Sequence, residues 1–325
     1  MDGAGRVVVV GSFNVDHVWR CPELPVPGAT LAGDYLSGPG GKGFNQAVAA
    51  ARAGATTSFV CALGNDAGGA LARSLAAADA IDLHAMASDA PTGTAGIFVD
   101  AAGRNSIVIG AGANAGLDPA FVASCAGVFR GAAVVLVQLE TPFDSVVAAL
   151  ARGRADGATT ILNPAPAPDL EAGRRDALLA LADVLTPNET EFASLCNASG
   201  AGISADAVAG MDDGRLHALC RKLLPGGTVV VTLGAAGAFV SHRDDARRGD
   251  GRACYRLPAE PAATIDTTGA GDAFNGALAA AIAGQATPFA GMARFAGRYA
   301  ALSTERAGAA DAMPAREQVR MRFPA

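Results

Sequence analysis

The sequence has few aromatic residues and few charges, and this scarcity limits the partners it can bind. Only 5% of the 325 residues are aromatic and 17% are charged, and 25 Lys and Arg stand against 31 Asp and Glu for a net charge of −6. No basic run interleaved with aromatic residues occurs, so we expect no nucleic-acid partner.

Long hydrophobic runs are also missing. No apolar stretch reaches the roughly 18–20 residues that a bilayer span needs, and the first residues lack the basic-then-apolar order of a signal peptide. We therefore expect no membrane association and a cytoplasmic location.

Paired cysteines are a third absence. The sequence has no Cys-x-x-Cys motif and no histidine at metal-ligand spacing from a cysteine. We expect reduced thiols that lie mostly in the core, as is usual in cytosolic chains. The six cysteines are Cys21, Cys61, Cys125, Cys196, Cys220 and Cys254.

What the sequence does contain is a series of short apolar runs alternating with Ala-rich, helix-like stretches. Strands that are apolar throughout indicate a parallel sheet covered on both faces. The pattern predicts an α/β fold with a doubly wound, mostly parallel sheet. The expected strands are Val7–Val10, Ser58–Ala62, Val134–Leu139, Thr159–Leu162, Val184–Thr186 and Val229–Leu233, and the expected helices are Asn45–Arg52, Leu71–Ala78, Ser145–Arg152 and Leu216–Leu224.

Two segments interrupt this alternation. Residues 13–37 contain prolines and short polar-apolar alternation, and residues 94–109 read as two strands around a turn at Asp100–Gly103. We expect them to pair into one small antiparallel sheet that could cover a site. The division is then an α/β core of residues 1–12, 38–93 and 110–325, with a lid of residues 13–37 and 94–109.

The strongest motif is the heptad Asp266–Asp272, which leads directly into an apolar helix. Its small residues let the backbone approach a ligand, and the free N–H groups of Gly269, Ala270 and Gly271 at a helix start can bind an anion. The carboxylate of Asp272 could accept a proton from an attacking hydroxyl as a phosphoryl group arrives. The alternative is that Asp272 only caps the helix.

A second glycine cluster, Gly38–Gln46, opens another helix. Gly38, Gly40 and Gly43 fit the G-x-G-x-x-G pattern, but the cluster does not follow the first strand as a dinucleotide site requires. It is not a P-loop either, because Leu36 occupies the position of the first glycine. The glycines permit close backbone approach while Lys42 and Asn45 offer donors, which suits a polyol.

Polar residues follow two of the expected strands. Asn14 and Asp16 come after the first strand, and Glu140 ends the strand Val134–Leu139. Ligands of doubly wound sheets bind outside the carboxyl ends of the strands, so we expect Asp16, Glu140 and Asp272 to converge there. Turn formation by Asn14 and Asp16 is the alternative.

Two further segments have a structural and a functional interpretation. Asn188 and Glu191 form either a capping box or a site that organises magnesium from its outer sphere. Thr232–Gly237 is either a hairpin turn or a glycine-lined border for a nucleotide.

At these residues the sequence resembles the ribokinase-like (phosphofructokinase B) family of sugar kinases, from about Val7 to Pro314. The heptad Asp266–Asp272 reads D-T-x-G-A-G-D, and Gly40–Gln46 reads G-G-K-G-x-N-Q. The resemblance implies a two-segment β lid that is often shared in a homodimer. Further matches point to the branch of the family that acts on free D-ribose, and they are Asn14–His17, Gly112–Ala115, Asn163–Ala167 and Thr186–Glu191.

The resemblance also implies a role for each matching residue. Asp272 would be the general base in contact with the sugar, beside the anion hole of Gly269, Ala270 and Gly271. The other sugar ligands would be Asn14, Asp16, Gly40, Gly41, Lys42, Asn45 and Glu140. The residues serving ATP and Mg²⁺ would be Asn188, Glu191, Thr232, Gly234, Gly237, Gly271 and Gly297. An activating K⁺ would be held by the Asp266 carboxylate and by carbonyl groups at Thr268, Ser303, Arg306 and Gly308.

Two positions depart from the family pattern. Gly297 stands where the family usually places a His or Asn beside adenine, which leaves nucleotide preference open. Ala312 replaces a hydroxyl residue in the monovalent-cation loop, so we expect a weaker K⁺ site.

These features together predict a kinase that transfers the γ-phosphate of Mg-ATP to the O5 hydroxyl of D-ribose. A nucleoside or another sugar remains the alternative acceptor, because lid and pocket shape decide it and no motif specifies them. A non-catalytic ligand-binding regulator on the same fold is the alternative of a different class. It is disfavoured because a protein that only binds has no need of a base.

Overall fold

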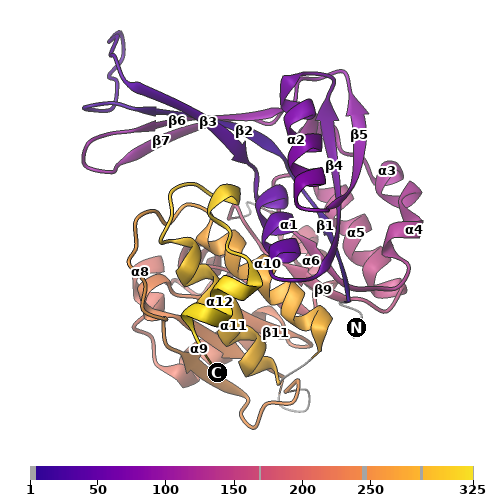
Figure 1. Ribbon diagram of the computed structural model, residues 1–325. Helices are drawn as coiled ribbons and strands as arrows, with labels where there is room; N and C mark the ends of the chain where they lie inside the picture. The colour runs from indigo at the N-terminus through magenta and orange to yellow at the C-terminus, as the bar shows by residue number, and fades with distance from the viewer. Residues whose placement is uncertain (1–4, 168–169, 244–246, 286–287, 325) are drawn as a thin grey trace.

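The computed structural model describes residues 5–167, 170–243, 247–285 and 288–324. The described chain forms a nine-stranded sheet and a separate four-stranded sheet. In Figure 1 the nine-stranded sheet lies among the helices, whereas the four-stranded sheet projects away from one end of the body.

The large sheet has the strand order β13-β12-β11-β10-β9-β8-β1-β4-β5. The pairs from β5 to β11 are parallel, and only the two pairs that include β12 are antiparallel. This confirms the doubly wound, mostly parallel fold class. The strands are β1 (Arg6–Val10), β4 (Thr56–Gly64), β5 (Asp82–Ser88), β8 (Ala132–Val137), β9 (Thr159–Leu162), β10 (Val184–Leu185), β11 (Thr228–Thr232), β12 (Ala238–Ser241) and β13 (Cys254–Leu257).

Helices cover both faces of this sheet. Alternate residues of one strand enter different cores: Val7 and Val9 belong to one, and Val8 and Val10 to the other. This explains why the strand is apolar throughout. The first core contains α1 (Lys42–Arg52), α2 (Ala67–Ala78), α10 (Ala270–Gly284), α11 (Phe289–Ser303) and α12 (Arg316–Arg322). The second contains α3 (Pro119–Ser124), α4 (Ala126–Phe129), α5 (Phe143–Ala155), α6 (Ala172–Leu179), α7 (Glu189–Asn197), α8 (Ala205–Val208) and α9 (Asp213–Leu223).

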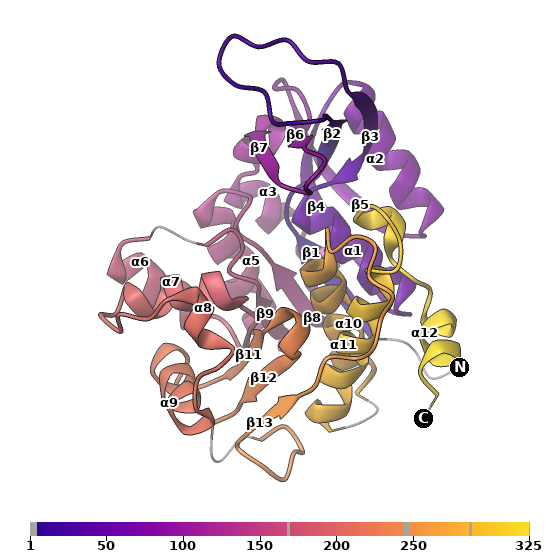
Figure 2. The ribbon, with the colours of Figure 1, turned by 90° about the vertical axis from the view of Figure 1, so that its left-hand side faces the viewer.

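The four-stranded sheet has the order β3-β2-β6-β7. Its strands are β2 (Asn14–Arg20), β3 (Asp34–Gly40), β6 (Gly93–Val99) and β7 (Asn105–Gly110). The two outer pairs are antiparallel hairpins, and the central pair β2–β6 is parallel, starting where Asn14 lies opposite Gly93. The expected pairing of the two segments into one sheet is therefore confirmed. Figure 2 shows the long connection between β2 and β3 at the free end of this sheet.

Several element boundaries differ from the sequence-based expectation. The helix expected to start at Asn45 starts at Lys42, because the Gly-containing segment before it is already helical. The strand expected to end at Leu139 ends at Val137. Three short 3₁₀ helices complete the fold: η1 (Gly112–Gly116), η2 (Gly234–Ala236) and η3 (Ala310–Ala312).

Glycines allow α1 to lie close against the end of β1. Gly41 has φ 86°, in the left-handed region that favours glycine. A Cβ at Gly43 would lie 2.5 Å from the backbone nitrogen of Ser12 and 2.6 Å from the carbonyl carbon of Gly11. The start of α1 therefore sits directly beside the residues that follow β1.

The structure also bears on the expectations about membrane spans and cysteines. Among the described residues, no helix combines the length and apolar character needed to cross a bilayer. The six cysteines form no disulfide within the described residues, and five of them are buried while Cys254 is half-buried.

Candidate active site

Polar residues that follow β9 and β10 meet the first turns of α1 and α10. They line a cavity of about 170 Å³ that contains Lys42, Asn163, Glu191 and Asp272. A larger cavity of about 520 Å³ shares Asn188, Thr232, Thr267, Ala270 and Gly271 with it. The two cavities form one cleft with a small polar end and a large end.

Asp272 lies in the first turn of α10 but does not cap it. The residue before the helix is Gly269, with φ 74°, and no side chain caps this end. The Asp272 carboxylate instead accepts a hydrogen bond from Asn45 Nδ2 at 3.0 Å and from Gln46 Nε2 at 2.8 Å. The interpretation of Asp272 as a plain helix cap is therefore wrong.

The surroundings of Asp272 suit a proton acceptor. Burial raises its pKa above the ordinary value, while Lys42 and the amides of Asn45 and Gln46 act to lower it. The Asp272 side chain is buried, yet the preceding Gly271 is exposed and lines the cleft. Donors at a helix start next to a carboxylate of raised pKa can bind an anion and take a proton.

Lys42, Glu191 and Asp272 line this end of the cleft, and the charges of Asp16 and Glu140 interact with theirs. The pKa of Asp16 is raised to about 6 by burial and by the negative charges of Glu140 and Asp272. Burial acts to lower the pKa of Lys42, but Asp272, Glu140 and Glu191 outweigh it and raise the pKa above its ordinary value. The expected convergence of Asp16, Glu140 and Asp272 is thus reflected in their mutual electrostatic effects.

The Glu140 carboxylate is held by two donors from neighbouring elements. Its Oε2 accepts hydrogen bonds from Ser12 Oγ at 2.6 Å and from the backbone N–H of Lys42 at 2.9 Å. Ser12 is fully buried just after β1. The end of β1, the segment after β8 and the start of α1 are therefore joined through one carboxylate.

Asn14 lies where the small sheet leaves the core. Its Oδ1 accepts a hydrogen bond from Asn114 Nδ2 at 2.9 Å, and the same Asn114 side chain also bonds to both backbone groups of Phe13. Gly40 lies opposite Asn14 in β3, and a Cβ at Gly40 would collide with the Asp16 carboxylate. Asn14, Asp16, Gly40 and Gly41 therefore lie together at the base of the small sheet.

Asn188 and Glu191 form the predicted capping box at the start of α7. Asn188 Oδ1 accepts from Glu191 N at 2.9 Å, and Glu191 Oε2 accepts from Asn188 N at 2.9 Å. Burial raises the pKa of Glu191 to about 7, although the Asn188 N–H and the charge of Lys42 oppose the rise. The same two residues also line the small cavity, so the structural interpretation does not exclude a functional one.

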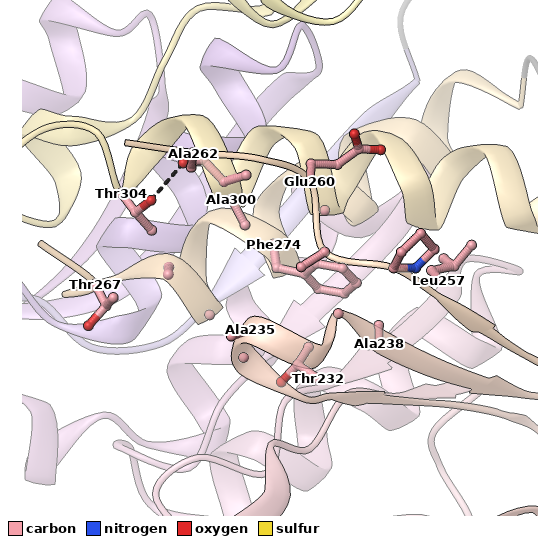
Figure 3. Close-up of a pocket in the computed structure, with 18 of the residues that line it drawn as sticks. Thr232, Ala235, Ala238, Leu257, Glu260, Ala262, Thr267, Phe274, Ala300 and Thr304 are labelled. Atoms are coloured by element: carbon pink, nitrogen blue, oxygen red, sulfur yellow. Dashed lines mark hydrogen bonds between the residues drawn. The ribbon is translucent and has the colours of Figure 1, made fainter. Parts of the chain in front are cut away.

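The large end of the cleft has a different lining. Figure 3 shows Phe274 of α10 in the middle. Ala300 of α11 and Thr304, just after that helix, lie on one side, and Thr232, Ala235 and Ala238 lie on the other. Thr232 and Ala238 belong to the antiparallel strands β11 and β12, so the segment Thr232–Gly237 is a hairpin turn and borders the cavity as well. Gly297 lines this end, and a Cβ placed there would meet nothing within 4 Å.

The loop before α10 is fixed by the Asp266 carboxylate. Oδ1 accepts hydrogen bonds from Thr268 N and Thr268 Oγ1, and Oδ2 accepts from the backbone N–H of Gly308 at 2.9 Å. Although burial acts to raise it, the pKa of Asp266 lies below its usual value because of these bonds. Asp266 thereby joins the loop before α10 to the segment after α11, which contains Arg306 and Gly308 and follows Ser303, the last residue of that helix.

Several residues of the site were not singled out from the sequence. Gln46 contacts Asp272 directly, and Gln138, Asn163, Thr186 and Asn275 extend the hydrogen bonding around it. The available signal was a polar side chain at the end of an apolar strand, as with Gln138 and Asn163. Asn45 was expected to donate to a ligand, but one of its donors is used by Asp272, and its Oδ1 is buried without a partner among the described residues.

Comparison with known proteins gives a consistent result. Residues 4–316 match the pfkB family of carbohydrate kinases. The ribokinase of Haemophilus influenzae is 36% identical over 315 residues, which is 96% of each chain. A bifunctional ribokinase/ribose-5-phosphate isomerase A of Fructilactobacillus sanfranciscensis is 35% identical over 97% of this chain, and the chain spans 55% of that longer protein.

The fold comparison agrees with the sequence comparison. The structure of Arabidopsis thaliana ribokinase complexed with ribose and ATP superposes with a TM-score of 0.82. The two chains are 29% identical, and the match covers 98% of each.

Proposed function

Because the chain belongs to the pfkB family of carbohydrate kinases, we propose that it transfers the γ-phosphate of Mg-ATP to the O5 hydroxyl of D-ribose. The product is D-ribose 5-phosphate. The observation that carries the proposal is Asp272, a buried carboxylate at a helix start that lines the small cavity, next to Gly271, which lines both cavities. The relatives named ribokinase support ribose as the acceptor.

In the proposed reaction, Asp272 takes the proton of the attacking hydroxyl. The hydroxyl oxygen forms the new bond to the γ-phosphorus, and the bond from phosphorus to the departing ADP oxygen breaks. The N–H groups of Gly269 and Gly271 stabilise the charge on the transferring group. The N–H of Ala270, which was also expected to be free, donates to the carbonyl of Thr267 at 3.1 Å. Positioning and charge stabilisation supply most of the catalysis.

The sugar occupies the end of the cleft where the small sheet meets the core. Asp16 and Glu140 accept hydrogen bonds from its ring hydroxyls, and Asn14 and the backbone of Gly40 and Gly41 line its other side. Lys42 and Asn45 complete the contacts. The carboxylates at this end raise one another's pKa, because their negative charges repel. Hydroxyl groups of a sugar that donate hydrogen bonds to these carboxylates would stabilise the negative charge, which supports a sugar site here.

ATP occupies the large end of the cleft. Its base and ribose lie along Thr232, Gly234, Gly237 and Gly297, and its phosphates point to Asn188 and Gly271. A cavity of about 520 Å³ lined mainly by small and apolar side chains suits a purine nucleotide.

Mg²⁺ would arrive with the ATP phosphates. The described residues contain no group of three or more acidic, His or Cys side chains that could hold a metal by themselves. That fits Mg²⁺, which keeps several waters and binds phosphates with one or two carboxylates. Glu191 would orient the waters of the ion, which would neutralise phosphate charge.

We also propose an activating K⁺ beside the loop before α10. The residues fit such an ion: within the described residues, the carbonyl oxygens of Thr268, Arg306 and Gly308 accept no backbone hydrogen bond, and the ionised Asp266 lies among them. Ser303 would add a fourth carbonyl. Because Ala312 has no side-chain oxygen, we expect a high K⁺ requirement that Ala312→Ser lowers. A K⁺ titration at fixed ionic strength tests this, and a flat response would remove K⁺ from the proposal.

The small sheet is proposed to be a lid, made of residues 13–37 and 94–109, that closes over the sugar and excludes water. It is also the proposed homodimer contact. Its exposed apolar side chains support this, since they include Tyr35 and Leu36 on one edge and Ile107, Val108 and Ile109 on the other, each at least half exposed. Sedimentation of the protein and of Val108→Lys measures the dimer directly.

The experiment that tests the main proposal is a screen of ADP release with D-ribose, other pentoses, hexoses and nucleosides. We expect the highest kcat/KM for D-ribose, and Asp272→Asn serves as the control for contaminating kinases. A nucleoside or another sugar with a higher kcat/KM would replace ribose as the acceptor. Ribose binding without any turnover would instead favour a ligand-binding regulator.

A further inference from the structure

Gln46 is a buried residue whose side chain touches the proposed base. It lies in the first turns of α1 and is fully inaccessible to solvent. Its Nε2 donates to Asp272 Oδ1 at 2.8 Å and to Asn163 Oδ1 at 3.0 Å, and its Oε1 accepts from Gln138 Nε2 at 2.5 Å. Every polar atom of the Gln46 side chain is therefore engaged.

The orientation of this amide follows from a backbone group. The carbonyl oxygen of Thr186 can only accept, so Asn163 must point Nδ2 toward it, at 3.0 Å. Asn163 Oδ1 then faces Gln46, which must present its NH₂ group to Asn163 and Asp272 together. Gln138 in turn donates to the remaining Gln46 oxygen, although this leaves Gln138 Oε1 without a partner among the described residues.

The same chain of bonds returns to the helix that carries Asp272. Thr186 Oγ1 donates to Asn275 Oδ1 at 2.5 Å, and Asn275 Nδ2 donates to the carbonyl of Gly271 at 2.8 Å. Thr186, Asn163, Gln138 and Asn275 are all buried. One polar network therefore holds both the Asp272 carboxylate and the backbone carbonyl of Gly271. Its side chains come from α1, from α10 and from the residues that follow β8, β9 and β10.

We infer that Gln46 is a positioning residue for the phosphoryl transfer: its fixed amide holds the Asp272 carboxylate in the orientation that receives the proton. The inference rests on the proposed function of Asp272. Gln46 itself lines neither cavity, so it acts on the ligands only through residues that do, above all Asp272. Asn45 holds the other carboxylate oxygen, which completes a two-point support.

The amide also favours the charged form of the base. Burial raises the pKa of Asp272, and the hydrogen bond from Gln46 opposes that rise. Loss of the donor therefore raises the pKa further. A larger fraction of the base is then protonated at a given pH, and the acidic limb of the kcat profile moves to higher pH.

The test is Gln46→Met, which keeps an unbranched side chain and removes both amide atoms. We expect kcat to fall about 10- to 100-fold through misorientation of the base, while KM for sugar and for ATP stays within about threefold. When Asp272 is already replaced by Asn, Gln46→Met should lower kcat by less than about threefold, because Gln46 acts through Asp272. Gln318→Met, the same change on α12, is the matched control and should leave kcat and its pH profile unaltered.

A second readout needs no acceptor sugar. With ¹³C-carboxyl-labelled aspartate, the Asp272 signal is the one missing in Asp272→Asn, and it should titrate at higher pH in Gln46→Met than in the wild type. That shift in a protein that phosphorylates no sugar would refute the proposed function but would still show that Gln46 controls the protonation of Asp272. An unchanged titration in an active enzyme would overturn the inference. If Gln46→Met does not fold, Gln138→Met should show a smaller shift in the same direction, and its absence would overturn the inference equally.

Discussion

The two ends of the cleft are built in different ways. At the small end, polar side chains that follow β1, β8, β9 and β10 or lie in α1 and α10 hold one another, and Asp272 and Glu140 each accept two hydrogen bonds from the protein. At the large end, glycines, alanines and a hairpin turn form the wall. The small end is thus organised before any ligand binds, as electrostatic catalysis requires, whereas the large end leaves contacts to be completed by the ligand.

The largest effect should come from removing the general base at the small end of the cleft. Asp272→Asn keeps the shape and removes proton acceptance, so we expect kcat to fall by about 10²- to 10⁴-fold. Sugar and ATP binding, measured by calorimetry, should remain within a few-fold. Retention of more than about a tenth of the activity would contradict the assignment of Asp272 as the base.

The next effect should come from Glu140→Gln. The amide oxygen can still accept from Ser12 and from the Lys42 N–H, so the local structure persists while the negative charge is lost. Hydrogen bonds to charged groups are worth about 1.5–3 kcal/mol, so we expect KM for the sugar to rise about 10- to 100-fold. KM for ATP should not change. The opposite pattern would place Glu140 at the nucleotide end, and the exposed Glu317→Gln is the control.

A third, smaller effect is a pH dependence of sugar binding. The pKa of Asp16 is raised to about 6, so Asp16 is ionised at pH 7.5 and mostly protonated at pH 5. If only the ionised form accepts the sugar hydroxyls, KM for the sugar should rise about tenfold between pH 7.5 and 5. Asp16→Asn should flatten this dependence. A steep dependence that persists in Asp16→Asn would assign it to another group.

The smallest effect on activity should come from a substitution at the large end of the cleft. Gly297 lies in the middle of α11 with open space at its Cβ position, so Gly297→Ala should stabilise the protein by up to about 1 kcal/mol and barely change KM for ATP. Thermal unfolding measures the first effect and kinetics the second.

The matched variant is Gly276→Ala in the neighbouring helix α10. Its Cβ would lie against the carbonyl oxygen of Gln46 and 2.8 Å from the backbone nitrogen of Ala50. We expect a destabilisation of about 1–3 kcal/mol from overpacking at the tight α1–α10 contact. If Gly297→Ala and Gly276→Ala changed the free energy of unfolding equally, the described difference in packing between the two ends of the cleft would be wrong.

The sequence predicted the core sheet well because the pattern is local. Fully apolar runs such as Val7–Val10 reveal buried strands without knowledge of their partners. The start of α1 was missed because Gly41 and Gly43, on either side of Lys42, belong to a residue type with low helix propensity. The parallel pairing of β2 with β6 depends on where both strands leave the core, which no local pattern encodes.

The site was predictable to a different degree. Asp272, Glu140 and Asn188 stand in recognisable motifs or at strand ends, so they could be named as candidates. The amide network could not be predicted, because Gln46 lies 117 positions from Asn163 and 226 from Asp272. Its hydrogen bonds exist only because β9, α1 and α10 pack together, and that packing is a property of the whole fold. The roles of the candidate residues remain predictions that the variants above test.

The buried cysteines have a practical consequence for following lid movement. Burial raises the pKa values of Cys61, Cys125, Cys196 and Cys220, so their thiols hold little of the thiolate that reacts with maleimides. Val26, at the free end of the small sheet, is 67% exposed. Val26→Cys therefore gives a selective attachment point for a fluorophore in the otherwise native chain, with mock-labelled wild type reporting any reaction at the half-buried Cys254.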